Sequence, residues 1–121
     1  MKKKLIYLLI LMLASACSWE NEETFYPEAE NCDTLDVSYA MDIVPVLANN
    51  CYSCHSNANA PDFGSGNAFE DHADVSASSS LIVAAINHLE GVPAMPKESD
   101  KLDDCTISMI EAWVNDGSPE N

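Results

Sequence analysis

The segment NNCYSCHSN, residues 49–57, limits what this chain can fold into more than any other feature of its sequence. Cys51 and Cys54 are three positions apart, and His55 follows directly. This spacing has three interpretations: a redox disulfide, part of a zinc site, or the attachment point of a covalently bound haem. The three imply different proteins, and the choice among them depends on the compartment in which the chain resides.

The N-terminus, MKKKLIYLLILMLASAC, has the layout of a secretory signal peptide, with a positive start, an apolar run from Leu5 to Leu13 and small residues before Cys17. The alternative, a retained anchor helix, would need about 20 apolar residues to cross a bilayer. Ala14-Ser15-Ala16-Cys17 resembles a bacterial lipobox, in which the cysteine is acylated after cleavage. We therefore expect residues 1–16 to be removed and Cys17 to carry a lipid. The protein would be an exported, membrane-anchored lipoprotein that faces the periplasm or the cell surface.

Removal of the signal peptide makes the chain strongly acidic. Of the basic residues, Lys97 and Lys101 remain against 20 acidic residues, a formal charge of −18. Such a surface excludes nucleic acid binding through phosphates and repels anionic lipid, so membrane contact depends on the lipid anchor. The charge serves either solubility or steering toward a basic partner. Residues 17–31 are acidic without an apolar period, and we expect them to form a flexible tether.

Residues 32–121 are expected to form one small domain without internal repeats. A domain of this size buries only about 60% of its unfolded surface and benefits from covalent links. With Cys17 assigned to lipid and the motif pair set aside, Cys32 and Cys105 remain. In an oxidising compartment these two most simply form a disulfide, the alternative being two free buried thiols.

Export favours one interpretation of the motif. A zinc site needs a second pair of ligands, whereas the other candidates are scattered singly along the chain: Cys32, His72, His88 and Cys105. A thioredoxin-like dithiol expects a βαβ context and no particular histidine after it. Haem attachment uses every residue of the motif, because two thiols bond the two vinyl groups and the next imidazole binds the iron. The sequence therefore predicts one covalently bound haem c, with His55 on its iron.

The candidates for the sixth ligand of that iron are Met41, Met95, Met109, His72 and His88. Met95 lies in GVPAMPK, where Pro93 and Pro96 restrict the chain and reduce the entropy lost when the sulfur is held in place. A thioether favours reduced iron and raises the potential. Met41 lies close to the motif in sequence, and Met109 falls within a helical period. We expect Met95 to be the ligand, and the two histidines are the next candidates.

Apolar periodicity indicates helices, and no segment alternates convincingly as a strand would. One helix is expected to start at a cap on Asp42, with Pro45 in its first turn, and to lead into the motif. Residues 68–75 predict a second, short helix.

Two longer helices are expected further along the chain. The pattern of residues 78–91 predicts a helix that ends at Gly91. The pattern of residues 102–117 predicts a helix with Asp103 as its cap and Gly117 as its stop. The predicted fold class is all-α. The expected inward positions of the helices are Ile43, Val46, Leu47, Leu81, Ile82, Ala85, Ile86, Leu89, Cys105, Thr106, Ile110, Trp113 and Val114.

These features together resemble a known family. A helix that enters Cys51-x-x-Cys54-His55, a proline-flanked Met95 about forty positions later, and the C-terminal helix DCTISMIEAWVNDG are similar to a class I, mitochondrial-type cytochrome c. More narrowly, the chain resembles the small monohaem cytochrome lipoproteins of Bacteroidetes-type bacteria. The resemblance extends from about Tyr39 to Gly117. It implies a class I cytochrome c fold of three to five helices around one haem.

The resemblance also implies roles for single residues. The two motif cysteines would form the thioethers, His55 would be the proximal ligand and Met95 the distal ligand. Pro61 would supply the backbone carbonyl that orients the proximal imidazole. Trp113 would pack across the first helix. The lysine ring of mitochondrial cytochromes is absent, so their partner recognition does not carry over.

The expected ligand set leads to a function. With both axial positions filled, the iron has no vacant site, and one-electron exchange at the haem edge is what remains. We expect an electron carrier rather than an enzyme, with redox proteins as partners and no small-molecule substrate. Two alternatives are a haem sensor or peroxidase-like domain with a labile distal methionine, and a non-haem binding module with structural cysteines.

Overall fold

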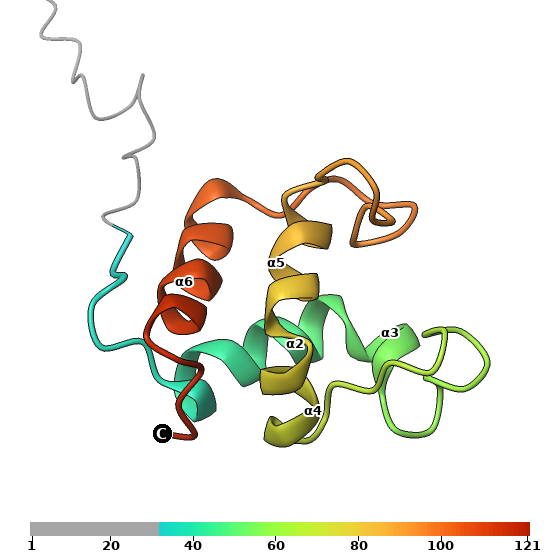
Figure 1. Cartoon of the computed structure of the whole chain (residues 1–121), viewed down its shortest axis with the longest axis horizontal. Helices are drawn as coiled ribbons and strands as arrows, with labels where there is room; N and C mark the ends of the chain where they lie inside the picture. Colours follow the sequence, from blue (N-terminus) through green and yellow to red (C-terminus); the bar gives the residue numbers. More distant parts are fainter. Residues whose placement is uncertain (1–31) are drawn as a thin grey trace, which may run out of the picture. The chain divides into compact units, whose positions relative to one another are not determined.

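The structure is a computed structural model that describes residues 32–121 (Figure 1). The expected signal peptide (1–16), tether (17–31) and lipidated Cys17 lie outside the described residues. Within residues 32–121 the chain forms helices and no strand, which confirms the all-α prediction for this part. The elements are the π-helical turn η2 (Tyr39–Ile43) and the helices α2 (Val44–Asn50), α3 (Tyr52–His55), α4 (His72–Ala77), α5 (Ser79–Ile86) and α6 (Asp104–Asn115).

The helices form two groups that cross each other. Helices α5 and α6 stand side by side in Figure 1, whereas η2, α2 and α3 follow one another along a second direction. A segment without regular structure, residues 87–103, connects α5 to α6. None of the helices in the described part of the chain is long and apolar enough to cross a membrane.

The first helical segment begins earlier than predicted. The Ser38 hydroxyl accepts a hydrogen bond from the Met41 N–H at 3.3 Å, and the Asp42 carboxylate accepts one from the Ser38 N–H at 2.8 Å. This reciprocal pair caps the helix and starts η2 at Tyr39. The prediction that Asp42 is the cap is therefore wrong, because Asp42 supports the cap from inside the first turn. Pro45 lies in the first turn of α2, as expected.

Helix α5 ends before Gly91, the predicted stop. Its last residue is Ile86, and Asn87 is the C-cap. His88 then takes up a left-handed backbone conformation, with φ at 57°, in the part of a helix end where glycine is most common. Gly91 also has a positive φ, but it lies in the loop that follows.

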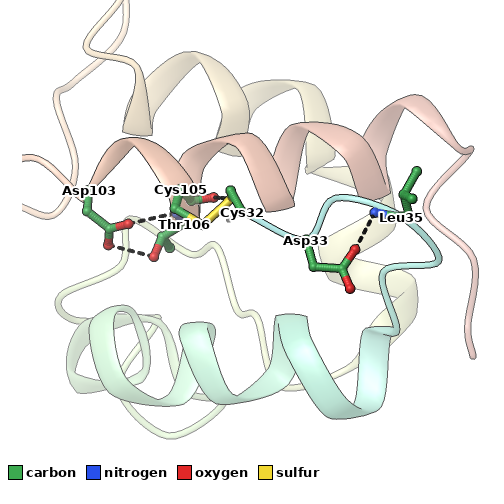
Figure 2. Close-up of a disulfide and its surroundings, with 6 residues drawn as sticks. All are labelled: Cys32, Asp33, Leu35, Asp103, Cys105 and Thr106. Atoms are coloured by element: carbon green, nitrogen blue, oxygen red, sulfur yellow. Dashed lines mark hydrogen bonds between the residues drawn. A yellow bond between two sulfur atoms is a disulfide. The ribbon is translucent and has the colours of Figure 1, made fainter. Parts of the chain in front are cut away.

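Both ends of α6 agree with the sequence prediction. The Asp103 carboxylate accepts hydrogen bonds from the Thr106 N–H at 2.9 Å and from the Thr106 hydroxyl at 2.6 Å (Figure 2). At the other end, Gly117 has a φ of 94° and its N–H donates to the Val114 carbonyl at 3.0 Å. The cap and the glycine stop therefore satisfy backbone groups that the helix itself cannot.

One hydrophobic core joins the helices. Its buried side chains are Val37, Tyr39, Ile43, Leu47, Phe69, Val75, Ile82, Ile86, Ile107, Ile110 and Trp113. Most of the expected inward positions belong to this core or pack against it, but Leu81 and Leu89 are 45% and 54% exposed. Leu89 lies beyond the end of α5, so the helical period no longer applies to it. Leu81 borders a cavity.

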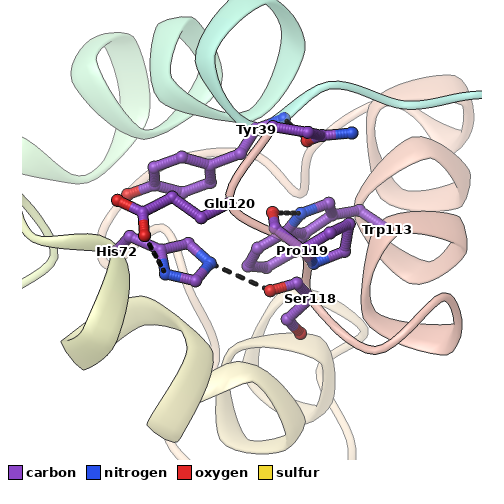
Figure 3. Close-up of polar contacts among 7 residues, drawn as sticks. Tyr39, His72, Trp113, Ser118, Pro119 and Glu120 are labelled. Carbon is purple, nitrogen blue, oxygen red and sulfur yellow. Dashed lines mark hydrogen bonds and ion pairs between the residues drawn. The ribbon is translucent and has the colours of Figure 1, made fainter.

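An aromatic cluster joins the first and last helical segments (Figure 3). Trp113 of α6 is 1% exposed and stacks on Tyr39 of η2, with ring centroids 5.5 Å apart. Its Nε1 donates to the Pro119 carbonyl at 2.9 Å. His72 of α4 meets the Tyr39 ring edge-on, with centroids 4.7 Å apart, and its Nε2 donates to the Ser118 carbonyl at 2.9 Å. Trp113 thus packs against the first helical segment, as expected.

Cys32 and Cys105 are joined by a disulfide, with their sulfur atoms 2.11 Å apart (Figure 2). The pairing is the one expected from the cysteine count. It links the segment before η2 to the first turn of α6, across a sequence separation of 73 residues.

Candidate functional site

A cavity next to α3 is lined by all three side chains of the motif. Cys51 lies at the junction of α2 and α3, and its carbonyl accepts hydrogen bonds from the N–H groups of Cys54 at 3.1 Å and His55 at 2.8 Å. The motif is therefore a single helical turn. Residues three and four positions apart share one side of such a turn, which brings both thiols and the imidazole to the same cavity.

The loop that follows α3 fixes the His55 ring. Its Nδ1 lies 2.8 Å from the Asn67 carbonyl oxygen. Because a carbonyl can only accept, Nδ1 carries the proton, and in the neutral ring Nε2 keeps its lone pair. The Phe69 ring stacks on the imidazole, with centroids 4.6 Å apart and planes 17° apart, and the Phe69 N–H donates to the His55 carbonyl at 2.8 Å.

Gly64 allows this loop to approach the motif closely. A Cβ added at Gly64 would lie 2.8 Å from the Cys54 carbonyl oxygen, 2.9 Å from the Asn67 carbonyl oxygen and 2.9 Å from His55 Nδ1. Two of these atoms belong to the backbone and cannot rotate away. The backbone of Gly64 thus lies so close to His55 that a side chain at position 64 would have no room.

The prediction that Pro61 orients His55 is wrong. The carbonyl that bonds to Nδ1 belongs to Asn67, six positions further along, and Pro61 is an exposed residue outside the cavity lining. The loop runs outward through Pro61 before Gly64 brings it back to the imidazole. The glycine-rich run GSGN, residues 64–67, was the available sequence signal, because glycines mark places where backbone comes close to another group.

Met95 reaches the same cavity from a separate segment of the chain. It lies in the loop between α5 and α6, is half-buried, and lines the cavity together with Pro93 and Pro96. Its N–H donates to the Ala85 carbonyl, in the last turn of α5, at 3.0 Å. Met95 therefore lines the same cavity as His55, although the two residues are forty positions apart in the sequence.

The other four candidate ligands, all within residues 32–121, do not line this cavity. Met41 is 77% exposed, and Met109 packs against the core. His72 belongs to the aromatic cluster. His88 lies outside the cavity lining, but its Nε2 is 3.0 Å from the carbonyl oxygen of Met95.

The remaining walls of the cavity are mainly apolar. They include Phe63, Phe69, Leu81, Ile82, Ile86 and Leu102. No carboxylate of the described residues lines the cavity, although this part of the chain is strongly acidic. Lys97 is the charged residue at its edge. The cavity therefore suits an apolar group better than a hydrated ion.

The chemistry of the two motif thiols bears on the alternative interpretations. Cys51 and Cys54 are not bonded to each other, and burial raises the pKa of the Cys51 thiol to about 11. Redox-active dithiols have the opposite perturbation, a lowered pKa that provides thiolate at neutral pH. Among residues 32–121, no three His, Cys, Asp or Glu side chains gather closely enough to hold a metal ion.

Comparison of the chain with protein families, with curated proteins and with solved structures gives no significant match.

Proposed function

We propose that this protein is a monohaem c-type cytochrome that carries single electrons and is anchored by an N-terminal lipid. One observation carries the proposal: two thiols, one imidazole with a free Nε2 and one thioether line the same apolar cavity, although Met95 comes from a segment distant in sequence. This donor set fits an iron porphyrin, which needs two thiols for its vinyl groups and two axial ligands for its iron.

Each residue has a role in the proposal. Cys51 and Cys54 hold the haem covalently, His55 is the proximal ligand and Met95 the distal one. When bound, the haem supplies one-electron chemistry at the potential that its ligands and surroundings set. Asn67 holds the proton on His55 Nδ1 and increases the basicity of the ring toward the iron. The apolar walls exclude water from this group.

The arrangement of the helices supports a class I cytochrome c fold within this proposal. The Tyr39–Trp113 stacking joins the first and last helical segments, as expected of the C-terminal helix in that fold. The motif follows directly on α2, and the methionine loop lies between α5 and α6. These features agree with the order of elements that the sequence resemblance implies.

The rest of the proposal concerns the setting. The signal peptide and Cys17 would make the protein an exported lipoprotein facing the periplasm or the cell surface. Its partners would be redox proteins, with basic docking surfaces favoured by the acidic charge. With both axial positions filled, the protein would act on no small molecule and would not be an enzyme.

The test is to produce the chain in a host that exports and matures c-type cytochromes. The pyridine haemochrome spectrum should show a covalent haem that stays with the denatured polypeptide. The oxidised protein should show the far-red sulfur–iron band. Met95→Ala should keep the covalent haem, lose this band and have a lower potential. Met41→Ala is the matched control, since Met41 is exposed and outside the cavity, and it should leave both properties unchanged.

Two outcomes would replace the proposal. A colourless preparation from the same host, or one that holds only zinc, would exclude haem attachment. A haem protein that readily binds carbon monoxide would instead favour the sensor or peroxidase-like alternative, because a firmly held Met95 leaves no open site on the iron.

A further inference from the structure

His88 combines an unusual backbone with a specific side-chain contact. Its φ of 57° lies in the left-handed region, which non-glycine residues seldom adopt. The residue is exposed and does not line the cavity. Its Nε2 lies 3.0 Å from the Met95 carbonyl oxygen, so Nε2 carries a proton and donates it. The left-handed turn after α5 thus directs the imidazole back onto the methionine loop.

Two hydrogen bonds hold the Met95 backbone against the end of α5. The Met95 N–H donates to the Ala85 carbonyl at 3.0 Å, and the Met95 carbonyl accepts from His88 at 3.0 Å. The same Ala85 carbonyl also accepts a hydrogen bond from the His88 N–H at 3.1 Å, so the left-handed turn and the methionine loop meet at this group. The first bond joins two backbone groups, so a side-chain substitution does not remove it directly. The second bond comes from the His88 side chain, and a substitution at His88 can remove it.

We propose that His88 is a positioning residue that keeps the Met95 thioether in the cavity by holding the Met95 carbonyl. The inference rests on the proposed function, in which Met95 is the distal ligand. His88 would act through the loop backbone, since it does not line the cavity. Without such contacts, a loop of 17 residues between α5 and α6 would have many conformations. The bond from His88 favours those in which Met95 lies in the cavity wall.

The test measures how easily an added ligand displaces Met95. Imidazole binds the oxidised iron only when the methionine is off, so its apparent affinity reports the population of the open loop. His88→Gly removes the donor and also relieves the left-handed backbone. We expect imidazole affinity to rise roughly fivefold, which is about 1 kcal/mol at 1.4 kcal/mol per tenfold. The sulfur–iron band should weaken, while the urea midpoint of unfolding does not fall.

Two further variants separate positioning from loop flexibility. His88→Gln keeps an N–H donor on a side chain of similar reach and should return imidazole affinity to within about twofold of wild type. Glu90→Gly adds a glycine to the same loop at an exposed residue whose side chain makes no hydrogen bond to the described residues. It should leave the affinity at the wild-type value.

Several results would overturn the inference. Unchanged imidazole affinity in His88→Gly, equal effects of Gly and Gln at this position, or an equal rise in Glu90→Gly would each remove the role of the His88 donor. A wild-type protein with covalent haem but no sulfur–iron band would show that Met95 is not the ligand, and the positioning role would fail while haem attachment stood. A wild-type protein without covalent haem would overturn the proposed function itself.

Discussion

Replacement of Gly64 by alanine should disturb the His55 environment more than the same change at Gly66, in the same loop. The new Cβ would lie 2.8–2.9 Å from three atoms, whereas ordinary contacts of a Cβ begin at 3.4 Å. Two of the three neighbours are backbone carbonyl oxygens, which move only if the backbone moves. The loop must therefore shift by about half an ångström, and the bond between His55 Nδ1 and the Asn67 carbonyl would lengthen.

The expected cost follows from these two effects. Overpacking of a tight site costs typically about 1–3 kcal/mol, and loss of one hydrogen bond costs about 0.5–1.5 kcal/mol. We expect the free energy of unfolding to fall by about 2–4 kcal/mol in Gly64→Ala. For a domain of this size, where each kcal/mol shifts Tm by about 4–8 °C, Tm should fall by roughly 10–30 °C. The potential of the haem protein should rise, because a less basic imidazole stabilises oxidised iron less well.

Gly66→Ala is the matched control in the same loop. Gly66 has a φ of 83°, and nothing lies within 4 Å of the position its Cβ would take. Its replacement strains the backbone by roughly 1–2 kcal/mol without touching His55. Circular dichroism melting and a redox titration of both variants separate the two effects. A Gly64→Ala protein that melts within 2–3 °C of wild type, or shifts the potential no more than Gly66→Ala does, would refute the close approach of this loop to the imidazole.

Two other predictions concern the stability of the domain. Cys105→Ser, which opens the bridge to Cys32, should lower the free energy of unfolding by up to about 4 kcal/mol, since the bridge closes a separation of 73 residues; equal urea midpoints for variant and wild type would contradict this. Asp103→Ala should cost about 1 kcal/mol through loss of the helix cap. Hydrogen bonds from Thr106 lower the Asp103 pKa, so this stabilisation is present above the ordinary carboxyl pKa and is lost as the pH falls through the lower value in the folded protein. The urea stabilities of Asp103→Ala and wild type should therefore converge in strong acid. A difference in stability between them that stays constant down to about pH 2 would exclude the cap as its cause.

The sequence predicted features that depend on residues close together in the chain or on composition. The periodicity of residues 104–115 and the Asp103 cap place α6, because both effects act within a few turns. The spacing of Cys51, Cys54 and His55 requires only one helical turn. The disulfide followed from counting, since only two cysteines remained once the lipid and motif positions were assigned.

Helix ends were less predictable than helix centres. Ser38 and Asp42 are both good capping residues, and both take part in the same reciprocal arrangement. Which of the two is the cap depends on where the preceding chain turns, and local propensity does not determine this. At the end of α5, His88 occupies a left-handed position, while the glycine that sequence favours for such a place lies three residues later.

The sequence by itself determined that the chain is helical where it is described, that a Cys-x-x-Cys-His turn follows the first helix, and which cysteines pair. Tertiary structure alone decided which carbonyl meets His55, which ring stacks on Trp113 and which side chain holds the Met95 loop. The physical reason is that these contacts join segments whose backbones approach only after the loops have closed. Tyr39 and His88 carry no local signal of their partners, and the glycines before Asn67 indicate a close approach without identifying the group approached. In each case the partner is set by the path of the chain between the two residues.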